Sequence, residues 1–153
     1  MKRTTIIETI IFLFAILFVY TGISKLIEYD AFKEQLLESP VLAPVAPLVA
    51  LTLPWLEFLV VLLMIFPRFR LKGFYAALSM MVGFTVYVII LLSISNKLPC
   101  SCGGIISALS WPQHIILNCG FIALGLIGTG LQRKQHKENM DGWGQLFGPN
   151  ILR

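Results

Sequence analysis

The chain has 153 residues, of which 57% are hydrophobic and only 13% are charged, and its formal net charge is +4. A soluble domain usually carries about 25% charged residues, so this composition excludes an ordinary water-soluble globule, and the mean hydropathy of +0.82 agrees. One domain is expected at this length. The composition therefore predicts an integral membrane protein whose first partner is the lipid bilayer.

Four apolar segments follow one another along the chain: 5–22, 45–66, 74–95 and 112–131. A hydrocarbon core of about 30 Å requires about 20 helical residues, and backbone groups in lipid must be hydrogen-bonded within their own segment. We therefore expect an all-α, four-helix transmembrane bundle. The first segment also has features of a secretory signal, but residues 20–25 offer no small-residue cleavage site, so we expect the helix to be retained.

Residues 26–43, between the first two segments, form the longest loop on the side predicted to lie outside. Phe32, Leu36 and Leu37 recur at roughly helical spacing among acidic residues and a lysine. This pattern predicts a short amphipathic helix that lies at the interface and ends before Pro40. Such a segment is usually a connector, and the alternative is a lid or a partner surface.

Basic residues are unevenly distributed between the two predicted sides. Nine of the twelve lysine and arginine residues precede the first segment, join the second to the third, or follow the fourth. The positive-inside rule then predicts a multi-pass protein with both termini cytoplasmic, and we expect the membrane to be the bacterial inner membrane. The same rule accounts for the net positive charge without any nucleic-acid partner.

The chain divides at the end of the fourth segment. Residues 1–131 form the predicted transmembrane domain, and residues 132–153 form a basic and then polar cytoplasmic tail. Alone in water such a tail is expected to be disordered. We expect it to be held either by the membrane surface or by another subunit.

Two cysteines separated by one residue, Cys100 and Cys102, lie in the second outer loop, where disulfides persist. The turn that follows Pro99 would accommodate a small, strained ring. Strained, exposed disulfides are easily reduced, and a bridge around one residue removes little chain entropy. The pair therefore favours catalytic thiol–disulfide exchange. Inert thiols and half of a metal site are the alternatives, although His114 is the only nearby imidazole and such a site needs about four ligands.

Cys119 lies within the fourth apolar segment. A cysteine in a membrane helix behaves by default as a small apolar packing residue. The alternative is a resolving cysteine that exchanges with the outer pair.

Polar residues at membrane depth form a second candidate site. Glu57 is the one acid deep in a predicted span, and such residues are functional candidates by default. Pro54 precedes it and removes a backbone hydrogen bond. His114 and Asn118 are four residues apart and share a helix face. Together the three side chains predict a pocket that would bind a quinone headgroup or carry protons. The alternatives are an interhelical hydrogen bond for Glu57 and an interfacial position for His114.

The chain resembles the MauE/DoxX superfamily of small four-helix membrane proteins over about residues 6–130. The resembling features, in order, are Gly22-Ile23-Ser24-Lys25, Phe32, Pro54 with Glu57, Cys100-Ser101-Cys102-Gly103-Gly104, and Asn118. The cysteine loop resembles the MauE-like branch, which implies a redox-associated role in maturation of a periplasmic amine dehydrogenase, beside thioredoxin-like proteins. The superfamily is also similar to vitamin K epoxide reductase and to quinone-linked disulfide oxidases, but this chain has C-x-C in place of C-x-x-C and no clear second outer pair.

Two functional hypotheses follow. In the first, a thiol-disulfide oxidoreductase exchanges disulfides with a periplasmic thioredoxin-like partner and passes electrons to a quinone. In the second, a non-enzymatic subunit anchors or stabilises a larger membrane complex. A transporter is disfavoured, because four helices without evident inverted repeats offer little gating machinery.

Overall fold

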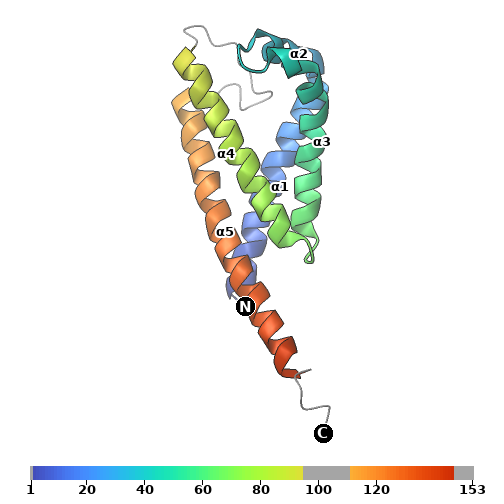
Figure 1. The fold of residues 1–153 in the computed structure, drawn as a ribbon, viewed down its shortest axis with the longest axis vertical. Coiled ribbons are helices and arrows are strands. Elements are labelled where there is room, and N and C mark those ends of the chain that lie inside the picture. Colours follow the sequence, from blue (N-terminus) through green and yellow to red (C-terminus); the bar gives the residue numbers. More distant parts are fainter. Residues whose placement is uncertain (1, 95–110, 147–153) are drawn as a thin grey trace.

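The computed structural model describes residues 2–94 and 111–146, and within these ranges every element is helical (Figure 1). The predicted all-α fold is thus confirmed. The elements are α1 (Lys2–Ile27), α2 (Tyr29–Glu38), the 3-10 turn η1 (Ala43–Val45), α3 (Ala46–Ile65), α4 (Arg70–Ile94) and α5 (Trp111–Leu146).

The four long helices form a bundle in which α1 packs on α3, α3 on α4, α4 on α5, and α5 on α1. Each is long and apolar enough to span a membrane, over the four ranges Arg3–Ile27, Ala43–Ile65, Arg70–Ile94 and Gln113–Asp141. Only 28–33% of each apolar window is buried inside the bundle. So much outward-facing apolar surface would be unstable in water, so the outer face of the bundle contacts lipid.

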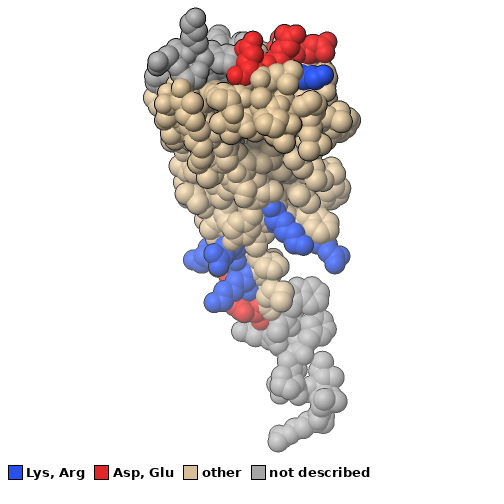
Figure 2. All heavy atoms as spheres, turned by 45° about the horizontal axis from the view of Figure 1, so that its top comes forward, with Lys and Arg blue, Asp and Glu red and all other residues tan. Residues whose placement is uncertain are grey.

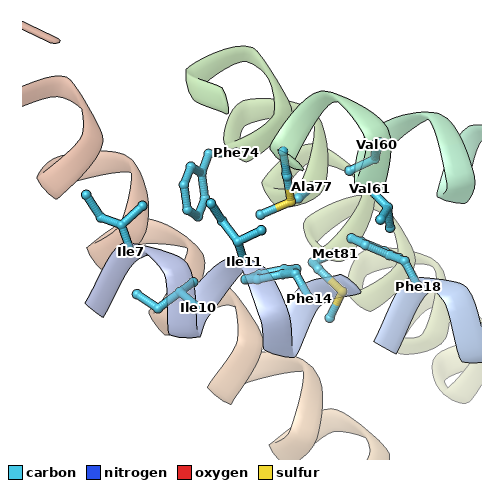
Figure 3. Packing of buried hydrophobic residues seen from close by; sticks show 11 residues of the cluster. Ile7, Ile10, Ile11, Phe14, Phe18, Val60, Val61, Phe74, Ala77 and Met81 are labelled. Atoms are coloured by element: carbon cyan, nitrogen blue, oxygen red, sulfur yellow. The ribbon is translucent and has the colours of Figure 1, made fainter. Parts of the chain in front are cut away.

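The core of the bundle joins α1, α3 and α4, and Figure 3 shows its side chains pointing toward one another. Phe14 and Phe74 are fully buried within it. A Cβ atom on Gly128 of α5 would lie 2.4 Å from the Phe74 ring, and one on Gly125 would lie 2.8 Å from Leu78. These two glycines therefore let α5 approach α4 closely, as small residues do at helix contacts in membranes.

Two other glycines of α5, Gly120 and Gly130, do not pack in this way. A Cβ atom on either would meet nothing within 4 Å. These two glycines lie on the outward face of α5 and take no part in its packing against α4.

The amphipathic segment is α2, at the end of the bundle away from the N-terminus (Figure 1). Leu36 is buried against Ala46 and Ala50 of α3, whereas the acidic side chains of α2 are exposed. The helix ends at Glu38, before Pro40, as predicted. Its C-cap, Ser39, is buried and accepts a hydrogen bond from the Tyr87 hydroxyl of α4 at 3.1 Å. This contact fixes the end of α2 to the bundle.

Charges separate between the two ends of the molecule. Figure 2 shows acidic residues gathered over α2 and lysine and arginine residues gathered at the opposite end. The start of α1 and the far part of α5 lie together at the basic end (Figure 1), where Arg3 Nη1 donates to Glu138 Oε2 at 2.7 Å. The two ends of the bundled chain are therefore on the same side.

The fourth spanning helix continues well beyond its apolar part. We expected a span of 112–131 and a separate tail, but α5 runs without a break to Leu146. Basic and polar residues such as Arg133, Lys134 and Lys137 are compatible with a helix, although they are poor residues for lipid contact. The division of the chain at residue 131 stays a prediction, but no break in secondary structure marks it.

Candidate functional site

A cavity of about 330 Å³ lies inside the bundle near the α2 end, lined by all five α-helices. It contains Glu57, His114 and Asn118, the three residues that the sequence singled out at membrane depth. It also contains Lys25 of α1. The remaining wall is mostly aliphatic and aromatic, as in most small-molecule sites.

An ion pair between two buried side chains forms part of the wall of this cavity. Lys25 Nζ donates to Glu57 Oε1 at 2.5 Å, and their side chains are only 8% and 6% exposed. Lys25 Nζ also lies 5.9 Å from the centroid of the Phe32 ring of α2, within the range of a cation–π contact. Desolvation makes such charges costly unless they are paired, so each side chain is needed to accommodate the other.

The local sequence explains why these two charges meet. Gly22 precedes Lys25 by about one turn, and a Cβ atom on Gly22 would lie 3.2 Å from Glu57 Oε2 and 3.0 Å from the Phe58 ring. The absence of a side chain at Gly22 therefore lets α3 approach α1 at the level of the carboxylate. The Gly22-Ile23-Ser24-Lys25 motif supplies both the space and the cation.

Pro54 lies one turn before Glu57 and is fully buried. The helix α3 continues through it from Ala46 to Ile65. Because proline has no N–H, the carbonyl of Ala50 lacks its usual intrahelical donor.

His114 and Asn118 come from one face of α5 and are 6% and 4% exposed. The His114 ring lies 5.5 Å from the Phe84 ring of α4, centroid to centroid. Two buried polar atoms of the cavity, Glu57 Oε2 and Asn118 Nδ2, have no hydrogen-bond partner within the described part of the chain. The cavity therefore presents one spare acceptor and one spare donor.

The α2 helix covers the outer end of the cavity. Phe32, Gln35 and Leu36 of this helix contribute to the lining. The amphipathic segment is thus more than a connector between two spans, because part of it forms the wall of the candidate site. Gly83 of α4 also lines the cavity and is exposed on the surface of the bundle.

Lys25 was not among the site residues predicted from the sequence, where it was named only as part of the Gly22-Ile23-Ser24-Lys25 motif. The structure extends α1 to Ile27 and buries Lys25. The available signal was its position, four residues after the polar Thr21 and within one turn of the end of an apolar run, together with a deep acid that required a partner.

The cysteines are not part of the described cavity. Cys100 and Cys102 lie outside the described residues, in the segment that connects Ile94 of α4 to Trp111 of α5. These two helix ends are at the α2 end of the bundle (Figure 1). Cys119 is a free thiol exposed on the outer face of α5, so the expectation that it is buried in the bundle is wrong.

Comparisons with known proteins give one match. The family model described as "Methylamine utilisation protein MauE" matches residues 3–131. This range includes the four apolar spans, the cavity residues and the Cys-Ser-Cys loop, and it leaves out the polar extension of α5. No curated protein matches the chain, and no solved structure matches it.

Proposed function

The chain belongs to the MauE family, and we propose that it is a redox-associated protein of the bacterial inner membrane. In this proposal Cys100 and Cys102 exchange thiols and disulfides with a thioredoxin-like or maturation partner on the periplasmic side. The wider kinship with DoxX proteins belongs to the same proposal. The observation that carries it is the cavity with four buried polar side chains, Lys25, Glu57, His114 and Asn118, at the end of the bundle to which residues 95–110 are connected.

The orientation follows from the charges at the two ends. Basic residues gather where α1 begins and where α3 is joined to α4, and acidic residues gather over α2. By the positive-inside rule the basic end is cytoplasmic. The loop 95–110 is then periplasmic, where a disulfide can persist, and both termini are cytoplasmic.

The exchange step conserves atoms and electrons. A thiolate of the reduced partner attacks the Cys100–Cys102 disulfide and forms a mixed disulfide. The second partner thiol then attacks that bond, so the partner leaves oxidised and the pair is left as two thiols. Restoring the disulfide releases two electrons and two protons, which require an acceptor.

The cavity residues fit a quinone as that acceptor. The volume of about 330 Å³ and the apolar lining suit one ring, and Lys25 and Asn118 carry donors for its oxygens. A bound quinone would supply two-electron, two-proton chemistry. The contribution of the chain is to hold the ring, to exclude bulk water and to keep a carboxylate and an imidazole within the cavity.

Trapping of the mixed disulfide tests the exchange. In the Cys102→Ser variant Cys100 is a lone thiol, which reaches the same mixed disulfide from the reverse direction by attacking the disulfide of the oxidised partner. Because Cys102 is then missing as the resolving thiol, the adduct through Cys100 should accumulate, and reductant should release it. The Cys119→Ser variant is the matched control, since that thiol is exposed on the outer face of α5. Intact-mass spectrometry under non-reducing conditions measures the adduct. If neither Cys100→Ser nor Cys102→Ser gives an adduct, the redox role is wrong.

A second candidate is a non-enzymatic subunit that anchors or stabilises a larger membrane complex. It is favoured by the polar extension of α5, which continues to Leu146, beyond the family match. Under this alternative, neither cysteine variant forms an adduct and both assemble normally. Deletion of residues 142–153 should then weaken copurification of the partner while membrane insertion remains intact.

A further inference from the structure

Two buried atoms in the cavity have no hydrogen-bond partner within the described residues, and the nearby Thr21 hydroxyl, which also lines the cavity, donates to Phe18 O at 3.3 Å. Glu57 is 5% exposed and Asn118 is 4% exposed, and their Oε2 and Nδ2 atoms are unpaired within residues 2–94 and 111–146. Buried polar groups in folded proteins are almost always hydrogen-bonded, and leaving one unsatisfied costs free energy. Both atoms belong to residues that line the same cavity, so a single ligand can satisfy both.

The chemistry of the two atoms defines that ligand. A carboxylate in an ion pair accepts hydrogen bonds and donates none, so Glu57 Oε2 requires a donor. Asn118 Nδ2 donates and therefore requires an acceptor. Because the rest of the lining is mostly apolar, the ligand is an uncharged molecule of the lipid phase with a hydroxyl group and an acceptor oxygen.

The cavity has a route for a hydrophobic tail. Gly83 lines the cavity and is exposed, and a Cβ atom built there would meet nothing within 4 Å. Gly83 therefore lies where the lining of the cavity meets the lipid-contacting surface of α4. A ring inside the cavity can therefore extend a chain past Gly83 into the bilayer.

The choice of a quinone-type ligand rests on the proposed function. We propose that the cavity binds the reduced hydroquinol in preference to the oxidised quinone. The carbonyl oxygens of a quinone only accept hydrogen bonds, whereas hydroquinol hydroxyls both donate and accept. Lys25 and Asn118 can donate to a ring oxygen in either form. Only Glu57 distinguishes the forms, because a hydroxyl satisfies its Oε2 and a carbonyl leaves it unpaired. Glu57 is thus the specificity-determining residue.

Equilibrium binding tests the preference without any thiol chemistry. The Cys100→Ser/Cys102→Ser chain in lipid nanodiscs is titrated anaerobically with decylubiquinol, with decylubiquinone, and with the dimethyl ether of decylubiquinol, and empty nanodiscs correct for partitioning. Decylubiquinol should bind about 10- to 100-fold more tightly than decylubiquinone, as expected for one hydrogen bond to a charged group. The dimethyl ether has a reduced ring without donors and should lose that advantage.

Substitutions of the cavity residues test which side chain causes the preference for hydroquinol. Glu57→Gln should bring the ratio of the two affinities to about one, because an amide can donate to a quinone carbonyl. The Lys25→Met/Glu57→Gln double variant serves where the single variant is poorly folded, since it leaves no unpaired charge. Asn118→Leu should weaken both ligands and keep their ratio.

The inference would be overturned by equal affinities, by tighter binding of decylubiquinone, or by no saturable binding of either form. The last result would mean that neither ligand occupies the cavity. None of these results depends on the cysteines. Adduct trapping in Cys102→Ser tests the thiol exchange separately, so failure of one proposal is distinguishable from failure of the other.

Discussion

Replacing Lys25 with methionine tests whether the buried ion pair holds the bundle together. The two side chains are 8% and 6% exposed and their charged atoms are 2.5 Å apart. Removing one partner of such a pair leaves an uncompensated buried charge, which costs about 3–5 kcal/mol. We therefore expect Lys25→Met to lower the free energy of unfolding by about that amount. The double variant Lys25→Met/Glu57→Leu should recover most of the loss, because apolar replacement of a whole buried pair is often neutral.

Reversible unfolding in mixed detergent micelles, followed by circular dichroism, measures these differences. Lys134→Met is the matched control, because Lys134 is exposed on α5, and surface substitutions usually change stability by less than about 0.5 kcal/mol. Glu57→Gln should be milder than Glu57→Leu, since the amide oxygen still accepts from Lys25. If Lys25→Met costs no more than Lys134→Met, the ion pair does not stabilise the fold and the reasoning fails.

Three further predictions use sites elsewhere in the bundle. Gly128→Ala should destabilise the protein by about 1–3 kcal/mol, because its Cβ would lie 2.4 Å from a buried ring of α4. Gly120→Ala should be neutral in the same unfolding assay, and equal effects of the two substitutions would contradict the packing of α5 on α4. Gly83→Phe should leave stability unchanged, since its Cβ meets nothing within 4 Å, yet weaken decylubiquinol binding at least about tenfold, and unchanged affinity would place the opening elsewhere. In spheroplasts that express the protein without its native cysteines, an impermeant maleimide should label a cysteine introduced by Glu34→Cys. It should reach one introduced by Lys72→Cys only after permeabilisation, and the reverse pattern would refute the orientation.

The spans and the amphipathic helix were predictable because they follow from local composition. An apolar run of bilayer length must be helical in lipid, and the spacing of Phe32 and Leu36 determines which face of α2 is buried. Glu57 was also predictable, because a carboxylate deep in a span is costly and requires a partner. The helix spacing that puts His114 and Asn118 on one face indicated their common site.

The identity of the partner of Glu57 was not predictable by the same reasoning. Lys25 lies 32 residues away along the chain, and its position at the edge of an apolar run is equally typical of a loop charge. Only the packing of α1 on α3, at the gap left by Gly22, shows that it is buried. The outward face of Cys119 is likewise a matter of helix rotation, which apolar composition on all sides leaves undetermined.

The length of α5 determines how far this helix extends beyond the hydrocarbon core. At 1.5 Å per residue its 36 residues extend about 54 Å, and a hydrocarbon core takes about 30 Å of that. The remainder is a stiff rod whose side chains keep a fixed rotational phase relative to the bundle. Inserting two residues beyond Glu138 would lengthen the helix by only about 3 Å but rotate the part after the insertion by about 200° around the helix axis. A partner that recognises one face of this rod would lose its contact through that rotation, whereas a partner tethered by a flexible linker would not be affected.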